Sequence, residues 1–468
     1  MSTFSYLANN KETTEKMLKE LGLKSLNDLF LDIPPQLILK QKPSADLPDP
    51  HSELETSRRL LFLSQKNLDS ASADIFLGSG IYDHFIPASV TEIANRAEFK
   101  TAYTPYAPEL SQGLLTTLYE YQSMICELTG LEVANTSMYD WSTALAESAL
   151  MCMRIKNKIK DPVFLVSTAI HPERLATLET YAKPLGLKIV KMPCGETGYL
   201  ETSELETMIT ENTIGVYVEN PNIFGIIQTD LKQIIDVCHN HEVLSVIGID
   251  PLSLGVLESP GALGADICVG EAHHLGNNPN FGGPGLGVLT SRNTKINIRN
   301  MPGRIIGYTT TKDNTRDAYI MTLQTREQHI RREKATSNIC TNESLFSVAA
   351  VAYLSILGPK GLEAIGLDIM GKIDYFVSNL NSKKLPIKVI ADGPFFREAL
   401  VKVPKQWYSQ LKGYLIAQNI VIGPDLMNQI RPEKLFSGFI FSITEKHTKE
   451  QIDKFIDHLV KFCDQEGD

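Results

Sequence analysis

The chain of 468 residues has no apolar segment long enough to cross a bilayer, and its first residues lack the apolar core of a signal peptide. Its longest apolar run, residues 344–358, contains serines and is shorter than the roughly 20 apolar residues that a membrane-spanning helix needs. We therefore expect this run to form a buried helix. We also expect a cytoplasmic protein with no membrane partner.

Positive charge is in short supply. The sequence has 45 lysine and arginine residues against 55 aspartate and glutamate residues, which gives a net charge of −10. Nucleic-acid binding depends on clustered lysine and arginine, so this balance argues against a nucleic-acid partner.

The seven cysteines are scattered, and the sequence contains no Cys-x-x-Cys pair and no Cys/His spacing of a zinc site. An odd, dispersed set of this kind predicts reduced, mostly buried thiols in a cytosolic protein. The adjacent His273 and His274 lack the i, i+4 spacing of two metal ligands on one helix face. We therefore predict no metal site.

Short aliphatic or β-branched runs alternate with helical patterns in the middle of the chain, which indicates a parallel sheet covered on both faces. The predicted strands cover residues 163–167, 187–192, 213–219, 244–249 and 265–270. The last helix is predicted to start at Thr448, where Thr448-x-x-Gln451 resembles a capping box. The chain is expected to fold as an N-terminal helical segment over residues 1–70, a large α/β domain over 71–340 and a small C-terminal α/β domain over 341–468.

Ligands of such a sheet bind beyond the carboxyl ends of its strands, so the residues that follow each strand are the first candidates. Asp250 ends the run VIGID, where it either keeps the ring nitrogen of a pyridoxal phosphate protonated or forms a turn before Pro251. His171 either stacks on a cofactor ring or begins the helix that starts at Pro172. The residue pattern leaves both pairs of alternatives open.

Two further stretches have the features of anion sites. The segment NTSMYDWST (135–143) precedes a helix whose first N–H groups either bind a phosphate or are capped by Asp140 or Ser142. Four glycines within residues 282–287 either let a ligand approach the backbone or form a tight turn between strands. Each stretch therefore has a ligand-binding and a purely structural interpretation.

The loop GEAHHLGNNPNFGGPGLG (270–287) has the shape of a cofactor loop but lacks a reactive side chain. Loops of this kind in pyridoxal phosphate enzymes carry a lysine that holds the cofactor covalently. No lysine occurs between Lys232 and Lys295. The loop therefore has the form of a cofactor-binding loop but lacks the lysine that would hold the cofactor.

Two other segments have unusual composition. In TAYTPYAPELSQG (101–113), prolines stiffen the chain, so Tyr103 and Tyr106 are either presented to a ligand or packed in a loop. LQTREQHIRREKATSNICT (323–341) concentrates basic residues in an otherwise acidic chain. It forms either a solvated face or a contact with an anionic group or an acidic partner.

These stretches, with FLGSGIYDHFIP, ENPNIFG, DPLSLGVL and MPGRIIG, resemble in order the N-terminal half of the glycine decarboxylase P-protein. The resemblance covers nearly the whole chain. It implies an α/β, aminotransferase-like fold (pyridoxal phosphate fold type I): a three-layer sandwich with a mainly parallel sheet and a small C-terminal domain. The length of the chain resembles that of the separate α subunit, subunit 1, of the two-subunit form.

The resemblance implies a part in decarboxylating glycine and in passing the aminomethyl group to the lipoyl arm of H-protein. In the family, subunit 2 (the β subunit) carries a His-Lys pair whose lysine holds pyridoxal phosphate. Aligned with that pair, His274 takes the lysine position, and histidine cannot form such a bond. The resemblance thus implies that the β subunit holds the cofactor, and that Asp250 and His171 belong to a vestigial pocket.

Sites of this fold are commonly shared between two chains, so we expect this chain to supply one wall of a composite site. Tyr103 and Tyr106 are the predicted catalytic residues, with Glu109 and Gln112 as second choices. The residues predicted to contact the lipoylated H-protein are Arg326, His329 and Arg331.

Two other functions stay open. One is a catalytically silent subunit that only folds and assembles with the β subunit. The other is an independent pyridoxal phosphate enzyme that uses an unexpected lysine such as Lys295.

Overall fold

The computed structural model describes residues 9–38, 51–101, 105, 107–195, 198–280, 282–340, 342–390, 393–426 and 436–466. The chain divides into two units, Met1–Asn67 and Leu68–Asp468. The elements of the first unit are α1 (Lys11–Glu20), the 3-10 turns η1 (Leu26–Phe30) and η2 (Pro35–Leu37), and α2 (Glu53–Ser64). Asn10 caps α1, and Ser52 forms a capping box with Glu55 at the start of α2. None of these described elements contains a buried residue.

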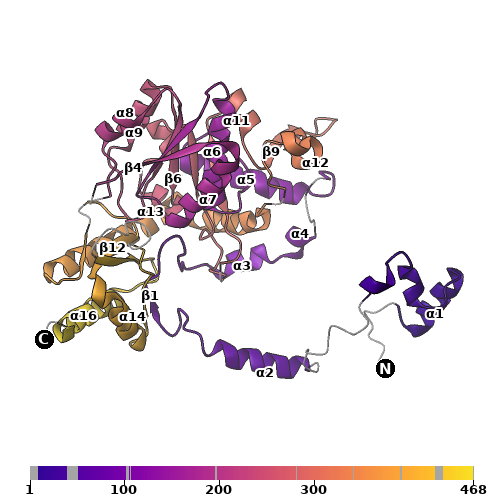
Figure 1. The fold of residues 1–468 in the computed structure, drawn as a ribbon, viewed down its shortest axis with the longest axis horizontal. Helices are drawn as coiled ribbons and strands as arrows, with labels where there is room; N and C mark the ends of the chain where they lie inside the picture. The colour runs from indigo at the N-terminus through magenta and orange to yellow at the C-terminus, as the bar shows by residue number, and fades with distance from the viewer. Residues whose placement is uncertain are drawn as a thin grey trace. The chain divides into compact units, whose positions relative to one another are not determined.

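The second unit is built on a seven-stranded sheet (Figure 1). The strand order is β2-β8-β7-β6-β5-β3-β4, and β8 alone runs antiparallel to its neighbours within this sheet. The strands are β2 (Val133–Ala134), β3 (Val163–Ser167), β4 (Lys188–Met192), β5 (Thr213–Glu219), β6 (Leu244–Ile249), β7 (Ile267–Glu271) and β8 (Gly287–Ser291).

The five strands predicted from the sequence are confirmed, with bounds that agree to within two residues. All seven residues of β5 are buried, which explains why a central parallel strand has a continuous apolar pattern. The sequence did not predict β8, because its first residue belongs to the glycine-rich tract before it.

Helices cover both faces of this sheet, so the large sheet is the middle of three layers. Phe164 and Val166 of β3 pack with α6 (Trp141–Ile155) and α7 (Pro172–Ala182). Leu165, which points to the other face, packs with α8 (Thr202–Met208) and α9 (Leu231–Asn240). The alternation of side chains along one strand therefore supplies both cores.

The remaining elements around the large sheet are short, apart from α5. They are α3 (Ala88–Ala94), α4 (Ala97–Lys100), α5 (Gln112–Thr129), η4 (Lys183–Leu185), η5 (Pro251–Gly255), α10 (Pro260–Leu263), α11 (Lys295–Asn300), the antiparallel hairpin β9 (Ile305–Thr310) and β10 (Asp317–Thr322), η6 (Gln324–Arg326), α12 (Gln328–Arg331) and η7 (Arg332–Lys334).

The long helix α13 (Ser344–Ser382) contains the apolar run that we expected to be buried. Within the described residues it is the one helix long and apolar enough to cross a membrane, and half of its most apolar window is buried. Gly358, at φ 60°, interrupts the helix before Pro359. The part before this break packs against α5 and α3, so α13 is a core helix of this unit.

A second, antiparallel sheet has the order β11-β12-β14, and β1 pairs with β13 beside it. The elements are β1 (Asp74–Ile75), β11 (Lys388–Val389), β12 (Glu398–Pro404), η8 (Lys405–Trp407), α14 (Tyr408–Ala417), β13 (Ile420–Val421), β14 (Phe436–Ser442) and α16 (Lys449–Glu466). The predicted cap of the last helix is confirmed, because Gln451 and Thr448 bond each other's backbone N–H groups.

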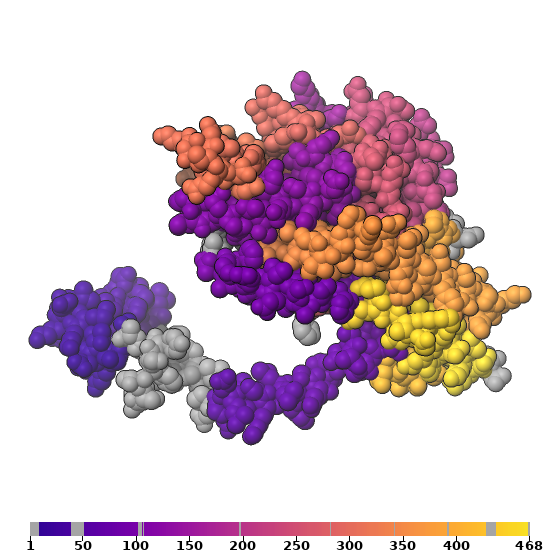
Figure 2. Space-filling view, turned by 180° about the vertical axis from the view of Figure 1, so that it is seen from behind, coloured from indigo at the N-terminus to yellow at the C-terminus, as the bar shows by residue number. Residues whose placement is uncertain are grey.

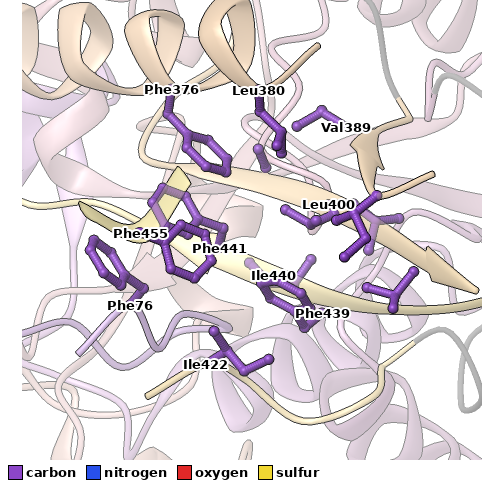
Figure 3. Packing of buried hydrophobic residues seen from close by; sticks show 14 of the residues in the cluster. Phe76, Phe376, Leu380, Val389, Leu400, Ile422, Phe439, Ile440, Phe441 and Phe455 are labelled. Atoms are coloured by element: carbon purple, nitrogen blue, oxygen red, sulfur yellow. The ribbon is translucent and has the colours of Figure 1, made fainter. Parts of the chain in front are cut away.

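Aromatic rings fill the core beneath this second sheet (Figure 3). Phe441 of β14 stacks on Phe376 of α13 at 3.7 Å between ring centroids and on Phe76 at 4.7 Å. Phe455 of α16 closes the group, 5.0 Å from both Phe441 and Phe76. Figure 2 shows the C-terminal residues, in yellow, gathered beside the orange residues of this region.

Candidate functional site

Two of the residues predicted after strands meet at the carboxyl edge of the large sheet. Asp250 follows β6 and His274 follows β7, and Asp250 Oδ1 lies 3.0 Å from His274 Nε2. The other carboxylate oxygen, Oδ2, lies 2.9 Å from Nε of Arg397, which directly precedes β12. All three side chains are buried. Burial opposes the charge of Asp250, but the charges of Arg397 and His274 outweigh it and lower the pKa of this carboxyl.

Asp250 also has the structural role that the sequence left as an alternative. The backbone N–H of Leu252 donates to Asp250 Oδ1 at 3.0 Å and caps η5. The carboxylate therefore holds a turn, a histidine and an arginine at once, and both of its oxygens already face partners.

A second buried ion pair lies beside the first. Arg174 of α7 donates to Glu219 Oε2 at 2.8 Å, and its guanidinium lies 3.5 Å from the ring centroid of Trp141. Tyr217 joins the pair, since its hydroxyl donates to Glu219 and accepts a bond from Trp141 Nε1. These buried polar groups satisfy one another, as buried charges must.

Two carboxylates occupy the start of α6, where the sequence left a phosphate site open. Asp140 caps the helix by accepting from the Thr143 N–H at 2.7 Å, so the capping alternative is the observed one. Glu271 Oε2 accepts from the Trp141 N–H at 3.1 Å, and its Oε1 accepts from the Leu286 N–H at 2.6 Å. The N–H groups of Trp141 and Thr143, which a phosphate would use at this helix start, are therefore already bonded.

The glycine tract allows this close packing. A Cβ atom on Gly285 would lie 2.9 Å from both Glu271 Oε2 and the backbone oxygen of Tyr139. A Cβ atom on Gly287 would lie 2.5 Å from the backbone oxygen of Asp140. These two glycines let the loop pass directly beside the start of α6.

His171 begins α7, as one of its two interpretations predicted. Its Nδ1 accepts from the Glu173 N–H at 3.2 Å, so the proton of the neutral ring is on Nε2. The residue is 8% exposed, and burial lowers its pKa to about 3. His171 is therefore an uncharged donor near neutral pH.

Several residues of this site were not found from the sequence. The guanidinium of Arg397 lies 4.1 Å from the ring centroid of Tyr82. The ring of His84 lies 5.3 Å from that of His274, and His84 Nδ1 is 2.7 Å from Glu445 Oε2. A signal existed for Arg397, a charge directly before an apolar strand, but only the fold brings these distant segments together.

The predicted catalytic residues lie in another part of the chain. Tyr103 and Tyr106 lie outside the described residues. Glu109 is exposed. Gln112 joins α5 to β10, because its amide donates to the carbonyl of Tyr319 at 2.9 Å and accepts from the N–H of the same residue at 2.9 Å.

The predicted partner-binding residues differ in their surroundings. The Arg326 guanidinium donates to the backbone carbonyls of Ile298, Met301 and Gly303, and burial lowers its pKa to about 10. His329 and Arg331 are exposed. His329 lines a groove of about 840 Å³ between the basic segment and helices α6 and α7.

Lys295 is exposed at the start of α11. It follows the end of the antiparallel strand β8, whose last residue, Ser291, pairs with the first residue of β7. Lys295 therefore lies at the sheet edge opposite Asp250, away from the cofactor position of this fold. No group of three metal-ligating side chains occurs within the described ranges.

The family model of the glycine cleavage system P-protein matches residues 4–459. The chain is 44% identical over 451 residues to the probable glycine dehydrogenase (decarboxylating) subunit 1 of Pyrococcus abyssi, covering 96% of this chain and 98% of the relative. It is 41% identical to the protein of the same description from Carboxydothermus hydrogenoformans, covering 97% and 99%.

Solved structures agree. The crystal structure of an inhibitor-bound glycine decarboxylase (P-protein) superposes with a TM-score of 0.87 at 36% identity, covering 98% of this chain and 100% of that one. A sphingosine-1-phosphate lyase from Burkholderia pseudomallei has a TM-score of 0.65 at 12% identity, covering 91% and 92%, and shows the fold alone. The predicted aminotransferase-like fold of pyridoxal phosphate enzymes (fold type I) is confirmed. The chain therefore belongs to the glycine cleavage system P-protein family.

Proposed function

We propose that this chain is the cofactor-free α subunit of a two-subunit glycine decarboxylase. A partner β subunit holds pyridoxal phosphate through its lysine, and this chain supplies one wall of a shared site. The assembly decarboxylates glycine and transfers the aminomethyl group to the lipoyl arm of H-protein. The proposal rests on membership of the family together with a pocket in which Asp250 already faces both His274 and Arg397.

The residues of this chain do not fit pyridoxal phosphate. Asp140 and Glu271 already accept from N–H groups at the helix start where a phosphate would bind. Asp250, which would face a ring nitrogen, is engaged by His274 and Arg397. No lysine lies between positions 232 and 295. These contacts support assigning the cofactor to the partner.

The wall of the shared site is proposed from the sequence. Tyr103 and Tyr106 would exclude water and orient glycine through rings and hydroxyls, with Glu109 and Gln112 in support. Pyridoxal phosphate, when bound to the partner, supplies the electron sink for decarboxylation.

We also propose that the basic segment contacts H-protein. Arg326 donates hydrogen bonds to three backbone carbonyls, so its proposed role is to stabilise the conformation of the segment. His329 and Arg331 are exposed and lie nearby on α12, so they are the residues that a partner can reach. Reversing the charge at Arg331 should weaken the apparent affinity for H-protein. Unchanged affinity would remove this contact from the proposal.

The first test is exchange of labelled bicarbonate into the glycine carboxyl group with lipoylated H-protein. The chain alone, the β subunit alone and their mixture are compared. Activity in the mixture only is expected. Activity in the chain alone would contradict the missing cofactor site, and full activity in the β subunit alone would contradict a shared site.

The second candidate is a catalytically silent, purely structural subunit. The pairing of Asp250 with His274 and Arg397 inside the chain favours it. Tyr106→Phe separates the two candidates, since it removes one hydroxyl. A shared site predicts a fall in exchange rate while the assembled complex elutes unchanged in size-exclusion chromatography. A scaffold predicts no change in either measurement.

A further inference from the structure

The guanidinium of Arg397 is buried, and the four N–H donors on its two Nη atoms are unused. The residue is 1% exposed, and none of Nε, Nη1 and Nη2 has a hydrogen-bond partner among the residues that the structure describes. Only Nε faces a carboxylate, 2.9 Å from Asp250 Oδ2. Buried donors without acceptors are costly, so the two Nη atoms favour an acceptor that the described residues do not supply.

The backbone holds Arg397 in place against strain. Its φ of 51° lies in the left-handed region, which residues with a Cβ atom rarely adopt. The N–H of Ile443 donates to the Arg397 carbonyl at 2.8 Å, and the N–H of Phe396 donates to the carbonyl of Gly225. Strained backbone that is braced on both sides is typical of ligand sites.

A second donor faces the same cavity. His171 is 8% exposed and lines the cavity together with Arg397. Because its Nδ1 accepts from the Glu173 backbone, its Nε2 carries the proton, and no described residue accepts it. The cavity is therefore rich in donors from two separate elements.

The charges around this cavity are nearly balanced. Arg174 is paired with Glu219 at 2.8 Å, and Asp250 is the single carboxylate that Arg397 contacts. Glu398 also lines the cavity, where it accepts from the Ser79 N–H at 2.5 Å. Burial raises the pKa of Glu398 to about 7, which lessens its repulsion of an anion near neutral pH.

The volume of the cavity limits the size of the ligand that can enter it. It measures about 20 Å³, room for one water or for one polar atom of a small ligand. It adjoins a wider cavity of about 560 Å³, and residues such as Gly80 and Trp141 line both. A small ligand can therefore place an oxygen in the inner space while the rest of it lies in the wider cavity.

We propose that this chain binds a small carboxylate or bicarbonate at the inner cavity, with coplanar oxygens on Nη1 and Nη2 of Arg397 and with His171 Nε2 as a further donor. Bidentate binding is the preferred geometry between a guanidinium and a planar oxyanion. The ligand site goes beyond glycine decarboxylation and lies in the subunit proposed to lack the cofactor. It requires neither the partner nor pyridoxal phosphate.

The test uses the purified full-length chain and ¹³C-labelled acetate, glycine or bicarbonate at constant ionic strength. Saturable broadening of the ¹³C signal is expected for at least one of the three anions. Acetate and bicarbonate binding without glycine would assign the site to simple anions, and glycine binding alone to an amino acid; both support the proposal. Absence of saturable broadening, or binding of inorganic phosphate only, would overturn it.

Arg397→Lys is the informative variant, because lysine keeps the charge beside Asp250 but cannot bind bidentately. The dissociation constant should rise at least about 10-fold. The control is Arg316→Lys, the same change on the exposed turn between β9 and β10, which should leave binding unchanged. Equal constants in the two variants would contradict the proposal.

A double variant, Arg397→Met with Asp250→Asn, covers the case in which Arg397→Lys does not fold. It removes both charges of the pair and all guanidinium donors. Loss of binding in a folded double variant is expected. Retained binding would overturn the assignment.

Discussion

Two buried regions of the second unit differ in the side chains that fill them. Beneath the antiparallel sheet, Phe76, Phe376, Phe441 and Phe455 stack on one another with no polar partner to satisfy. At the carboxyl edge of the large sheet, the buried groups are charged and hold one another in pairs. Apolar burial stabilises a fold directly, whereas buried charges stabilise it only as far as their pairing offsets desolvation.

The difference predicts how each region responds to mutation. An apolar core loses stability with every atom removed, and no second substitution restores it. A buried ion pair is damaged most by the loss of one partner and far less by the loss of both. A buried charged region contributes little net stability, so it is a region to examine for ligands, such as the one that we propose at Arg397.

Phe441→Ala should give the largest loss in the apolar region. The ring stacks on two others and is fully buried, so the substitution leaves a cavity. We expect a loss of about 3–5 kcal/mol in the free energy of unfolding, measured by urea denaturation. A loss below about 1 kcal/mol would show that the aromatic stack repacks.

Arg397→Met should cost a similar amount, about 3–5 kcal/mol, because it leaves Asp250 buried without its cation. Adding Asp250→Asn should recover most of that loss, which no second change can do for Phe441→Ala. Urea denaturation of the single and double variants measures the recovery. A double variant as unstable as the single would mean that the two regions do not differ in this respect.

Glu398→Gln tests the polar region through pH. Burial raises the folded pKa of Glu398 to about 7 from an ordinary 4.5. Its contribution to stability is fully present below the unfolded pKa and is lost as the pH rises through about 7. Between pH 5 and pH 8 the parent should therefore lose about 2–3 kcal/mol more than the glutamine variant. Parallel stability curves for the two proteins would contradict the raised pKa.

Two glycine substitutions should have opposite signs. Gly285→Ala places a Cβ atom 2.9 Å from Glu271 and from a backbone oxygen, and we expect a loss of about 1–3 kcal/mol. Gly413→Ala lies in α14 of the apolar region with open space around it, and we expect a gain of about 0.5–1 kcal/mol. Thermal unfolding of both variants measures the signs. The same sign in both would show that close approach at Gly285 is not what requires glycine.

Much of the fold could be predicted from local sequence patterns. The buried parallel strands such as β5 and β6 have aliphatic runs that no helix explains, and their bounds follow from those runs. The hairpin of β9 and β10 was missed because its strands mix polar and apolar residues on an exposed surface. The cap at Thr448 was found because capping depends on side chains only three residues apart.

Only part of the candidate site could be predicted from the sequence. Asp250, His171 and His274 stand at strand ends, which a strand pattern identifies. Arg397, His84 and Glu445 join this site from positions more than 80 residues away in the sequence, and each is an ordinary residue in its local context. Likewise, the basic segment suggested a uniform contact surface, yet Arg326 turns inward to backbone carbonyls.

The sequence by itself determined the class of fold, the order of the main strands and the absence of a lysine in the loop after β7, because each follows from residues close together along the chain. Only the tertiary structure decided which side chains surround His274. The pairing of Asp250 with both His274 and Arg397, and the donors left over on Arg397, depend on side chains from distant segments meeting in a buried space. In that space every unpaired charge has to find a partner, and sequence spacing does not specify which one.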